Sequence, residues 1–396
     1  MNISPLPTPY TLFTPADLDT ITFTSIQSPT DLDQEGLFPV TITTGDTTPQ
    51  VLLSLSLTPT EDHTVTLTSL RPIILDYIDS LTPTATAQPT RHFITLSLAT
   101  AQQRYDFTIL AARQPLTLPT ATLFQSFLTP AATLVRPLPP TAQYEPLHIL
   151  ETITQENSPL PTAHVTALWT DGYKARRTEQ ALTPATLETY ENTLTDDDQP
   201  AYYRISTLNA APTLLQPPTD DTTTATPYQL ISYDIQCGPR RQSYRIIPPS
   251  LTLTSDGPRP ILYANAFYLP EVIYFYGSTT HTHKPTYTAL RTYRALTINY
   301  ERTLVPTFTL HTGPLLPATL AQLPDLIISP RPYLLLSPDG SSLAPITLTE
   351  ASHAPTTIPT DLQTATITYR RPDDTFSLSI ATTPRTFDPT FDTTFY

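Results

Sequence analysis

The chain has 396 residues, a hydrophobic fraction of 39% and a formal net charge of −14, with only 21 lysines and arginines together. This length predicts two to four modules, each with its own apolar interior. The acidic balance argues against binding nucleic acid through its phosphates, and the single cysteine, Cys237, excludes an intrachain disulfide framework and a multi-cysteine metal site.

Proline is abundant and glycine is scarce, with 46 prolines against 8 glycines. Proline removes a backbone donor and breaks helix interiors, so long helices are excluded. Threonine, valine, isoleucine, tyrosine and phenylalanine suit the pleated surface of a strand. The composition therefore predicts an all-β protein of several antiparallel sandwich or barrel modules, with one or two short flanking helices.

The first module is expected over residues 1–117 as a β-sandwich. Three strands are predicted between residues 20 and 57, in ITFTSI, LFPVTITT and VLLSLSL. The segment 73–78 has the apolar spacing of one or two helical turns. The runs RHFITLSLAT and RYDFTILAA alternate at period two, as the strands of a hairpin do.

Residues 118–160 are rich in proline and have short apolar runs, which predicts an extended linker or strap. A second sandwich is expected over residues 161–257, with strands in HVTALWTD, AYYRIS, YQLISYDIQC and QSYRII. Trp169 is expected to be the largest side chain of its core.

The last module is expected over residues 258–396 as an antiparallel barrel or sandwich. It begins with the aromatic-rich run RPILYANAFYLPEVIYFYG and continues through six further strand-like segments. Leu315, Leu320 and Leu323 are spaced to form one short helix between two of these strands.

His281 and His283 form the sharpest candidate for a metal site. Their i,i+2 spacing on a strand points both imidazoles to one face, where they can bind a transition metal. The flanking Ser-Thr-Thr and Lys-Pro-Thr segments favour an exposed polar turn instead. We therefore predict no bound metal and no cofactor.

Three acidic clusters suggest calcium binding or glycoside hydrolysis. They are Asp196–Asp198, Asp220–Asp221 and Asp373–Asp374. None has the spacing and glycine of a calcium loop, which favours solvated surface loops. Cys237 has no neighbouring histidine to act as a base. An enzyme is therefore not predicted, and a β-sandwich glycoside hydrolase is the least favoured of three hypotheses.

Clustered aromatic residues suggest either a carbohydrate platform or a subunit interface. They are Tyr202, Tyr203, Tyr263, Phe267, Tyr268, Tyr274, Phe275 and Tyr276. Alternate residues of a strand face opposite sides, so half are expected in the core and half at an interface. We predict interface positions for Tyr274 and Tyr276. The same is predicted for the C-terminal aromatic residues Phe387, Phe391, Phe395 and Tyr396, docked on a neighbouring subunit.

Five segments spread over most of the chain carry a resemblance to a known family. They are LTPTEDHTVTLTSLRPIILDYI, YDIQCGPRR, ILYANAFYLPEVIYFYG, TLHTGPLLPATLAQLPDLIISPRPYLL and TFDPTFDTTFY. In this combination the chain resembles structural proteins encoded by tailed phages and prophages of Bacteroides-type gut bacteria. It departs from them in composition, because threonine, proline and arginine replace most of the glycine and lysine.

The resemblance implies a tail-tip or baseplate component, similar to a distal tail protein, that forms a homo-oligomeric ring and contacts other phage tail proteins. No run of eighteen apolar residues and no signal peptide is present in the sequence, so membrane insertion is not expected. We expect synthesis in the host bacterial cytoplasm and a final location in the virion tail. The alternative is a carbohydrate-binding receptor or adhesin module of a phage tail or cell surface.

Overall fold

The structure is a computed structural model of the whole chain. It describes residues 2–7, 11–26, 31–33, 35–45, 48–81, 91–113, 120–129, 135–192, 201–219, 228–248, 258–291, 297–313, 319–337, 340–353, 363–372 and 376–379. Within these ranges the chain is mainly β, in several antiparallel and mixed sheets, which confirms the predicted fold class. None of the helices in these ranges has the length and apolar character needed to cross a membrane.

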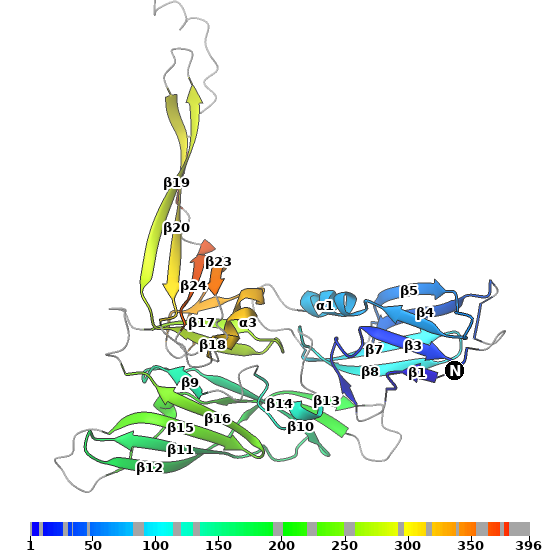
Figure 1. Cartoon of the computed structure of the whole chain (residues 1–396), viewed down its shortest axis with the longest axis horizontal. Coiled ribbons are helices and arrows are strands. Elements are labelled where there is room, and N and C mark those ends of the chain that lie inside the picture. Colours follow the sequence, from blue (N-terminus) through cyan, green and yellow to red (C-terminus); the bar gives the residue numbers. More distant parts are fainter. Residues whose placement is uncertain are drawn as a thin grey trace, which may run out of the picture.

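Two packed sheets form the first module (Figure 1). One has the order β1-β3-β6 and the other the order β2-β8-β7-β4-β5. Their strands are β1 (Asn2–Ser4), β2 (Leu12–Phe13), β3 (Thr20–Thr24), β4 (Phe38–Thr44), β5 (Val51–Leu57), β6 (Val65–Thr68), β7 (Phe93–Thr100) and β8 (Arg104–Leu110). The three strands predicted before residue 57 and the later hairpin are confirmed.

Period-two alternation builds the core of this module. Every second residue of β4 is buried, and Phe23 of β3 packs on Phe38 of β4 with ring centroids 5.0 Å apart. The predicted helical turns are confirmed as α1 (Arg71–Ser80), which has a proline in its first turn, as helix starts often do. Helix α1 buries Ile74, Tyr77 and Ile78.

The second module also contains two sheets, of orders β12-β11-β15-β16-β9 and β10-β14-β13. Their strands are β9 (Val135–Leu138), β10 (Pro146–Ile153), β11 (Ala163–Thr170), β12 (Ala175–Leu182), β13 (Ala185–Asn192), β14 (Ala201–Asn209), β15 (Gln229–Cys237) and β16 (Arg240–Ile246). Trp169 is buried in its core as predicted, and its Nε1–H donates to Thr178 Oγ1 over 2.8 Å.

The predicted strap over residues 118–160 is wrong for two segments, because β9 and β10 lie inside it. Strand β10 pairs along its whole length with β14 and buries Leu147, Ile149 and Leu150. The density of proline around β10 hid this strand, although proline at a strand end is compatible with pairing. The predicted strap also contains the short helix α2 (Thr120–Leu123), and the short turn η1 (Pro212–Leu214) follows β14.

The third module is built from two further sheets. The strands of the first, in order, are β18 (Pro270–Phe275), β17 (Arg259–Ala264), β21 (Tyr333–Leu335) and β22 (Leu343–Pro345). The second contains β19 (Thr279–Arg291), β20 (Thr297–His311), β24 (Ala365–Arg370) and β23 (Thr347–His353), with β25 (Phe376–Ser379) paired to β20. The predicted short helix is present as η3 (Thr319–Gln322) followed by α3 (Leu323–Ile328), and Leu320 and Leu323 are buried.

Shared apolar clusters hold the modules together. One face of the β17–β18 pair packs into the core of the second module through Val272 and Tyr274, and the other face lines the core of the third module through Ile273 and Phe275. Burial on both faces explains why this segment is a nearly continuous apolar run. A fourth cluster joins the first module to the other two.

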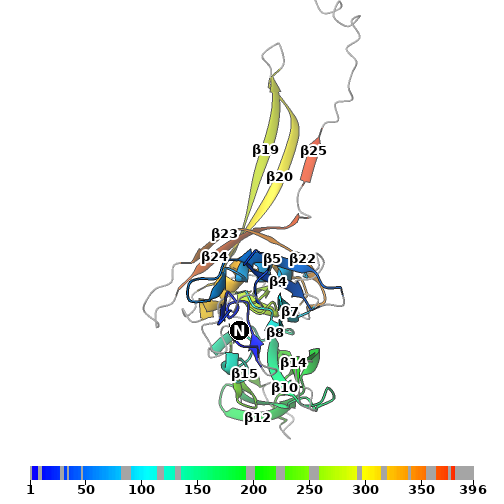
Figure 2. The same ribbon diagram turned by 90° about the vertical axis from the view of Figure 1, so that its right-hand side faces the viewer.

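A long β-hairpin leaves this body. Strands β19 and β20 have 13 and 15 residues, and both views show them extending well away from the packed modules (Figures 1 and 2). Strand β25 lies beside the hairpin in Figure 2 and pairs with β20 over residues 301–304. We call β19 and β20 the projecting hairpin.

Candidate functional site

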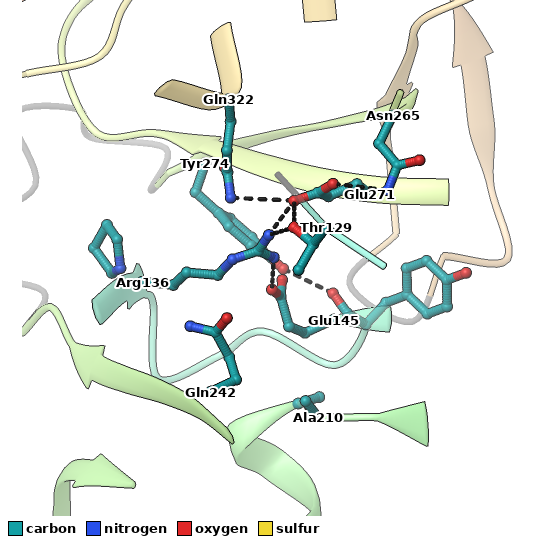
Figure 3. A network of polar contacts seen from close by, with 12 residues as sticks. Thr129, Arg136, Glu145, Ala210, Gln242, Asn265, Glu271, Tyr274 and Gln322 are labelled. Atoms are coloured by element: carbon teal, nitrogen blue, oxygen red, sulfur yellow. Dashed lines mark hydrogen bonds and ion pairs between the residues drawn. The ribbon is translucent and has the colours of Figure 1, made fainter. Parts of the chain in front are cut away.

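A cluster of charged side chains is buried where the second and third modules meet (Figure 3). Arg136 lies on β9, Glu145 directly precedes β10 and Glu271 lies on β18, and none of the three side chains is more than 4% exposed. Arg136 Nη1 donates to Glu145 Oε1 over 3.0 Å, and Nη2 donates to Glu271 Oε1. One guanidinium therefore joins two carboxylates from different modules.

Glu271 also accepts hydrogen bonds from three uncharged side chains. Thr129 Oγ1 and Gln322 Nε2 donate to its Oε1 over 2.8 Å and 3.2 Å, and Asn265 Nδ2 donates to its Oε2 over 3.1 Å. Asn265 Oδ1 accepts from the backbone N–H of Phe267, which fixes the turn between β17 and β18. We call Arg136, Glu145, Glu271 and these partners the junction cluster.

Burial dominates the electrostatics of the junction cluster. It raises the pKa of Glu145 to about 7, even though Arg136 acts in the opposite direction. Burial also tends to lower the pKa of Arg136, but the carboxylates of Glu271 and Glu145 outweigh it and hold that pKa above its ordinary value. An adjacent cavity of about 20 Å³ is large enough for one water and too small for a substrate. The cluster is therefore suited to holding modules together.

A second polar contact joins the first and second modules. Glu188 of β13 accepts the backbone N–H of His92 over 2.8 Å, and its Oε2 lies 2.9 Å from His92 Nδ1. Close by, Thr95 and Tyr190 share a hydrogen bond, and the rings of Phe93 and Tyr190 stack with centroids 5.6 Å apart. The modules are thus fixed by both polar and aromatic contacts.

The projecting hairpin is the candidate interaction site of the molecule. Its register runs from Thr279 opposite Leu310 to Arg291 opposite Thr297, with one irregularity after Thr288. The other side of β20 pairs with β24 and β25, whereas the outer side of β19 carries no strand within the described ranges. A free edge of this kind presents unpaired backbone donors and acceptors, which another chain can use.

His281 and His283 both lie on β19, near the base of this hairpin. The exposure predicted for both residues is confirmed, but the predicted polar turn is wrong, because both lie within a strand. The His281 ring packs edge-on against Phe308 on the facing strand, with centroids 4.7 Å apart, and His283 lies opposite Pro306. Among the described residues, no three histidine, cysteine, aspartate or glutamate side chains are grouped to hold a metal ion.

The structure corrects the interface predicted for Tyr274 and Tyr276. Both side chains are buried inside the chain itself, at 7% and 5% exposure. Their hydroxyls donate to the carbonyl oxygens of Tyr144 and Pro137, each over 3.0 Å. Strand β18 is covered on both faces, so the rings expected at a subunit interface bind the second module instead.

The same burial removes the proposed aromatic platform for sugars. Within the described ranges the rings of Tyr203, Tyr263, Tyr268 and Phe275 are fully buried, and Phe267 is 4% exposed. A sugar stacks on an exposed ring, so these residues do not provide such a surface. Seven of the eight residues that suggested a carbohydrate site therefore belong to the core, and Tyr202 is partly exposed.

Some predicted residues lie outside the described ranges. They are the C-terminal aromatic residues Phe387, Phe391, Phe395 and Tyr396, the acidic clusters Asp196–Asp198, Asp220–Asp221 and Asp373–Asp374, and Leu315. Cys237 lies inside them as the last residue of β15, opposite Arg240. Its side chain is buried, and burial raises the pKa of the thiol, which disfavours the reactive thiolate.

Sequence reasoning missed the junction cluster. One signal was available, because Glu271 is a single charge inside the apolar run YLPEVIYFY. A buried carboxylate requires a partner, so this residue predicts a buried cation elsewhere in the chain. Nothing local identifies that cation as Arg136, which is 135 residues away in sequence.

No protein-family model matches the chain, and no curated protein matches it. The resemblance to phage structural proteins therefore stays a prediction, as do the function and partners that it implies.

Proposed function

We propose that this chain is a structural component of a phage virion, located in the tail tip or baseplate, that assembles through its β modules. Its partners are further copies of the chain in a ring and other phage tail proteins. The observation that carries the proposal is the projecting hairpin, with its 13- and 15-residue strands directed away from the body.

The length of the projecting hairpin supports this assignment. Fifteen residues at about 3.4 Å each span roughly 50 Å. A two-stranded ribbon is only marginally stable by itself in water. Strands β24 and β25 support β20 over residues 308–311 and 301–304, so the ribbon beyond them gains most from a neighbouring subunit.

The contacts that fix the three modules to one another also support the proposed role. The junction cluster and the shared apolar clusters fix the three modules to one another. The hairpin grows directly out of this body, because only a short connection separates β18 from β19. A projecting element on a fixed base positions neighbours at a defined angle, which suits a ring.

The register of the hairpin allows a clean test. Because Thr286 pairs with Thr303, residues 287–302 can be replaced by Asn-Gly, which favours a tight hairpin turn. Antibodies against the chain are applied to particles from a producing culture, in immunogold electron microscopy. We expect gold at one end of the tail for the full chain, and at least a tenfold loss of label for the shortened chain.

Two controls make the result decisive. The shortened chain must unfold at the wild-type midpoint, which shows that the body is intact. Tyr173→Ala alters a different exposed hairpin tip, where Tyr173 is 93% exposed, and should leave the label unchanged. Particles without label, or equal labelling by the full and shortened chains, would rule out the proposed role.

A further inference from the structure

Among the residues that the structure describes, strand β5 is an open edge of the first module. It is the last strand in the order β2-β8-β7-β4-β5, and β4 is the one described strand that pairs with it. Natural edge strands are protected by charge, proline or bulges that discourage pairing with another chain. The sequence of β5, VLLSLSL, contains no charged residue, proline or glycine, and no ionisable side chain occurs from residue 47 to residue 60.

The middle of β5 is exposed. Leu55 is 41% exposed, and Ser54 and Ser56 on either side of it are exposed as well. Val51, the first residue of the strand, is 59% exposed. The β4–β5 ladder has one irregularity, at Leu52, and residues 53–57 pair regularly beyond it. Exposed leucine on an uncharged and regular stretch of edge is unusual for a strand that ends a sheet in water.

The leucines of β5 continue the core face of the sheet. Leu53, Leu55 and Leu57 lie opposite residues 42, 40 and 38 of β4. Those three β4 residues are buried apolar side chains of the first core. Residues directly opposite in a ladder share a face, so the apolar face extends to the last strand and is incompletely covered there.

Residues 53–57 read Leu-Ser-Leu-Ser-Leu, the same in both directions. In antiparallel pairing of two such strands about a two-fold axis at Leu55, Leu53 faces Leu57 of the other copy and Ser54 faces Ser56. Leu53, Leu55 and Leu57 of both copies then lie on one face of the joined sheets. A closed two-fold interface requires this kind of self-complementarity.

We propose that β5 pairs antiparallel with β5 of a second copy of this chain, in the register centred on Leu55, and joins two five-stranded sheets across a two-fold axis. The self-complementary sequence favours this occupant, and the charge distribution permits it, because two chains of net charge −14 repel each other least where neither carries an ionisable group. The proposal does not depend on the projecting hairpin and goes beyond the proposed function.

The size of the contact sets the expected affinity. One strand pair buries less than the roughly 1,200 Å² of total surface found in stable specific interfaces. We therefore expect a reversible dimer that is monomeric at low micromolar concentration and dimeric at several hundred micromolar. Sedimentation velocity of the full chain over this range of concentration measures the fraction of dimer.

Cysteine cross-linking tests the register. The only native cysteine is buried, so Leu55→Cys introduces a single accessible thiol. Under mild oxidation at high concentration we expect Leu55→Cys to give a disulfide-linked dimer. A mixture of Leu53→Cys and Leu57→Cys chains should give the mixed dimer in preference to either homodimer. Leu187→Cys is the matched control, because Leu187 is 40% exposed on the edge strand β13.

A charge on the edge tests the interface itself. Leu55→Lys should abolish the concentration-dependent dimer, since two lysines would meet at the axis, while Leu187→Lys should not. If Leu55→Lys does not fold, Leu55→Ser replaces it in the same measurement of the dimer. The proposal is overturned if the chain stays monomeric at several hundred micromolar, if Leu55→Lys leaves the dimer intact, or if Leu55→Cys cross-links no more than Leu187→Cys. The hairpin-shortened chain should still dimerise, so failure here and failure of the virion role are separable.

Discussion

The junction cluster and the projecting hairpin use hydrogen-bonding groups in opposite ways. Arg136, Glu145 and Glu271 are almost completely withdrawn from solvent and bind one another. Strand β19 is paired along one edge and leaves its outer edge free within the described ranges. The comparison sets charges that pair with one another inside the body against backbone groups on the outer edge of β19 that no described strand pairs.

The same contrast separates β18 from β5. Both are short apolar strands, but β18 is buried on both faces and β5 is exposed at its centre. Their similar apolar content does not predict this difference in burial. The difference is tertiary. The cores of the second and third modules cover the two faces of β18, whereas the described residues cover β5 only in part.

Removal of the guanidinium from the junction cluster should have the largest effect. Arg136→Met leaves two carboxylates buried without their cation, which typically costs about 3–5 kcal/mol. We expect a matching fall in the free energy of unfolding of the joined second and third modules, measured by urea denaturation. The matched control is Arg241→Met, because Arg241 pairs with Asp234 at 3.0 Å in an exposed position and should contribute at most about 1 kcal/mol. Equal losses in the two variants would contradict a structural role for the cluster.

A methyl group at the base of the projecting hairpin should have the next largest effect. In Gly277→Ala the added carbon would lie 2.6 Å from the His311 carbonyl oxygen and 2.8 Å from the Gly313 nitrogen. Both are backbone atoms that cannot move freely, so we expect a cost of about 1–3 kcal/mol. Hydrogen exchange should accelerate at the Gly277 amide, which donates to His311 over 2.9 Å. The control is Ser278→Ala, a change at the exposed neighbouring residue, which should leave hydrogen exchange at the Gly277 amide unchanged. Unaltered exchange in Gly277→Ala would contradict the close packing at the base of the hairpin.

The pH dependence of the junction cluster should be the smallest effect. The pKa of Glu145 is raised from 4.5 to about 7, so between these values the unfolded chain loses a proton that the folded chain keeps. The free energy of unfolding therefore falls as pH rises through this interval. Between pH 5 and pH 7.5 the free energy of unfolding of wild type should fall by on the order of 1–2 kcal/mol more than that of Glu145→Gln.

His148 acts in the opposite direction, because burial lowers its pKa to about 4. This contribution is present in both chains, so it cancels when Glu145→Gln is compared with wild type. Glu179→Gln, a change at an exposed carboxylate, should run parallel to wild type. Parallel curves for wild type and Glu145→Gln would mean that Glu145 is not protonated in the folded state.

Much of the fold was predictable because local alternation specifies strands. The runs that became β3, β4, β7 and β8 alternate at period two, and the pair ILYANAFYLPEVIYFYG forms β17 and β18. Strands β12 and β13 were missed, since ARRTEQAL and ATLETYEN contain few apolar residues. They are strands because β11 and β14 offer them a pairing edge, which no local pattern records.

The sequence by itself determined the class of this protein. Scarce glycine, abundant proline and β-branched side chains favour paired strands over long helices, because proline breaks a helix interior but is accepted at strand ends and on edge strands. Pro285, inside β19, is an example on a strand that ends its sheet within the described ranges. The tertiary structure alone decided which faces are covered. It placed Tyr274 and Tyr276 in the core and brought Arg136 to Glu271, because burial depends on segments far apart in the chain. It also left one edge of β5 and one edge of β19 without a partner among the described strands.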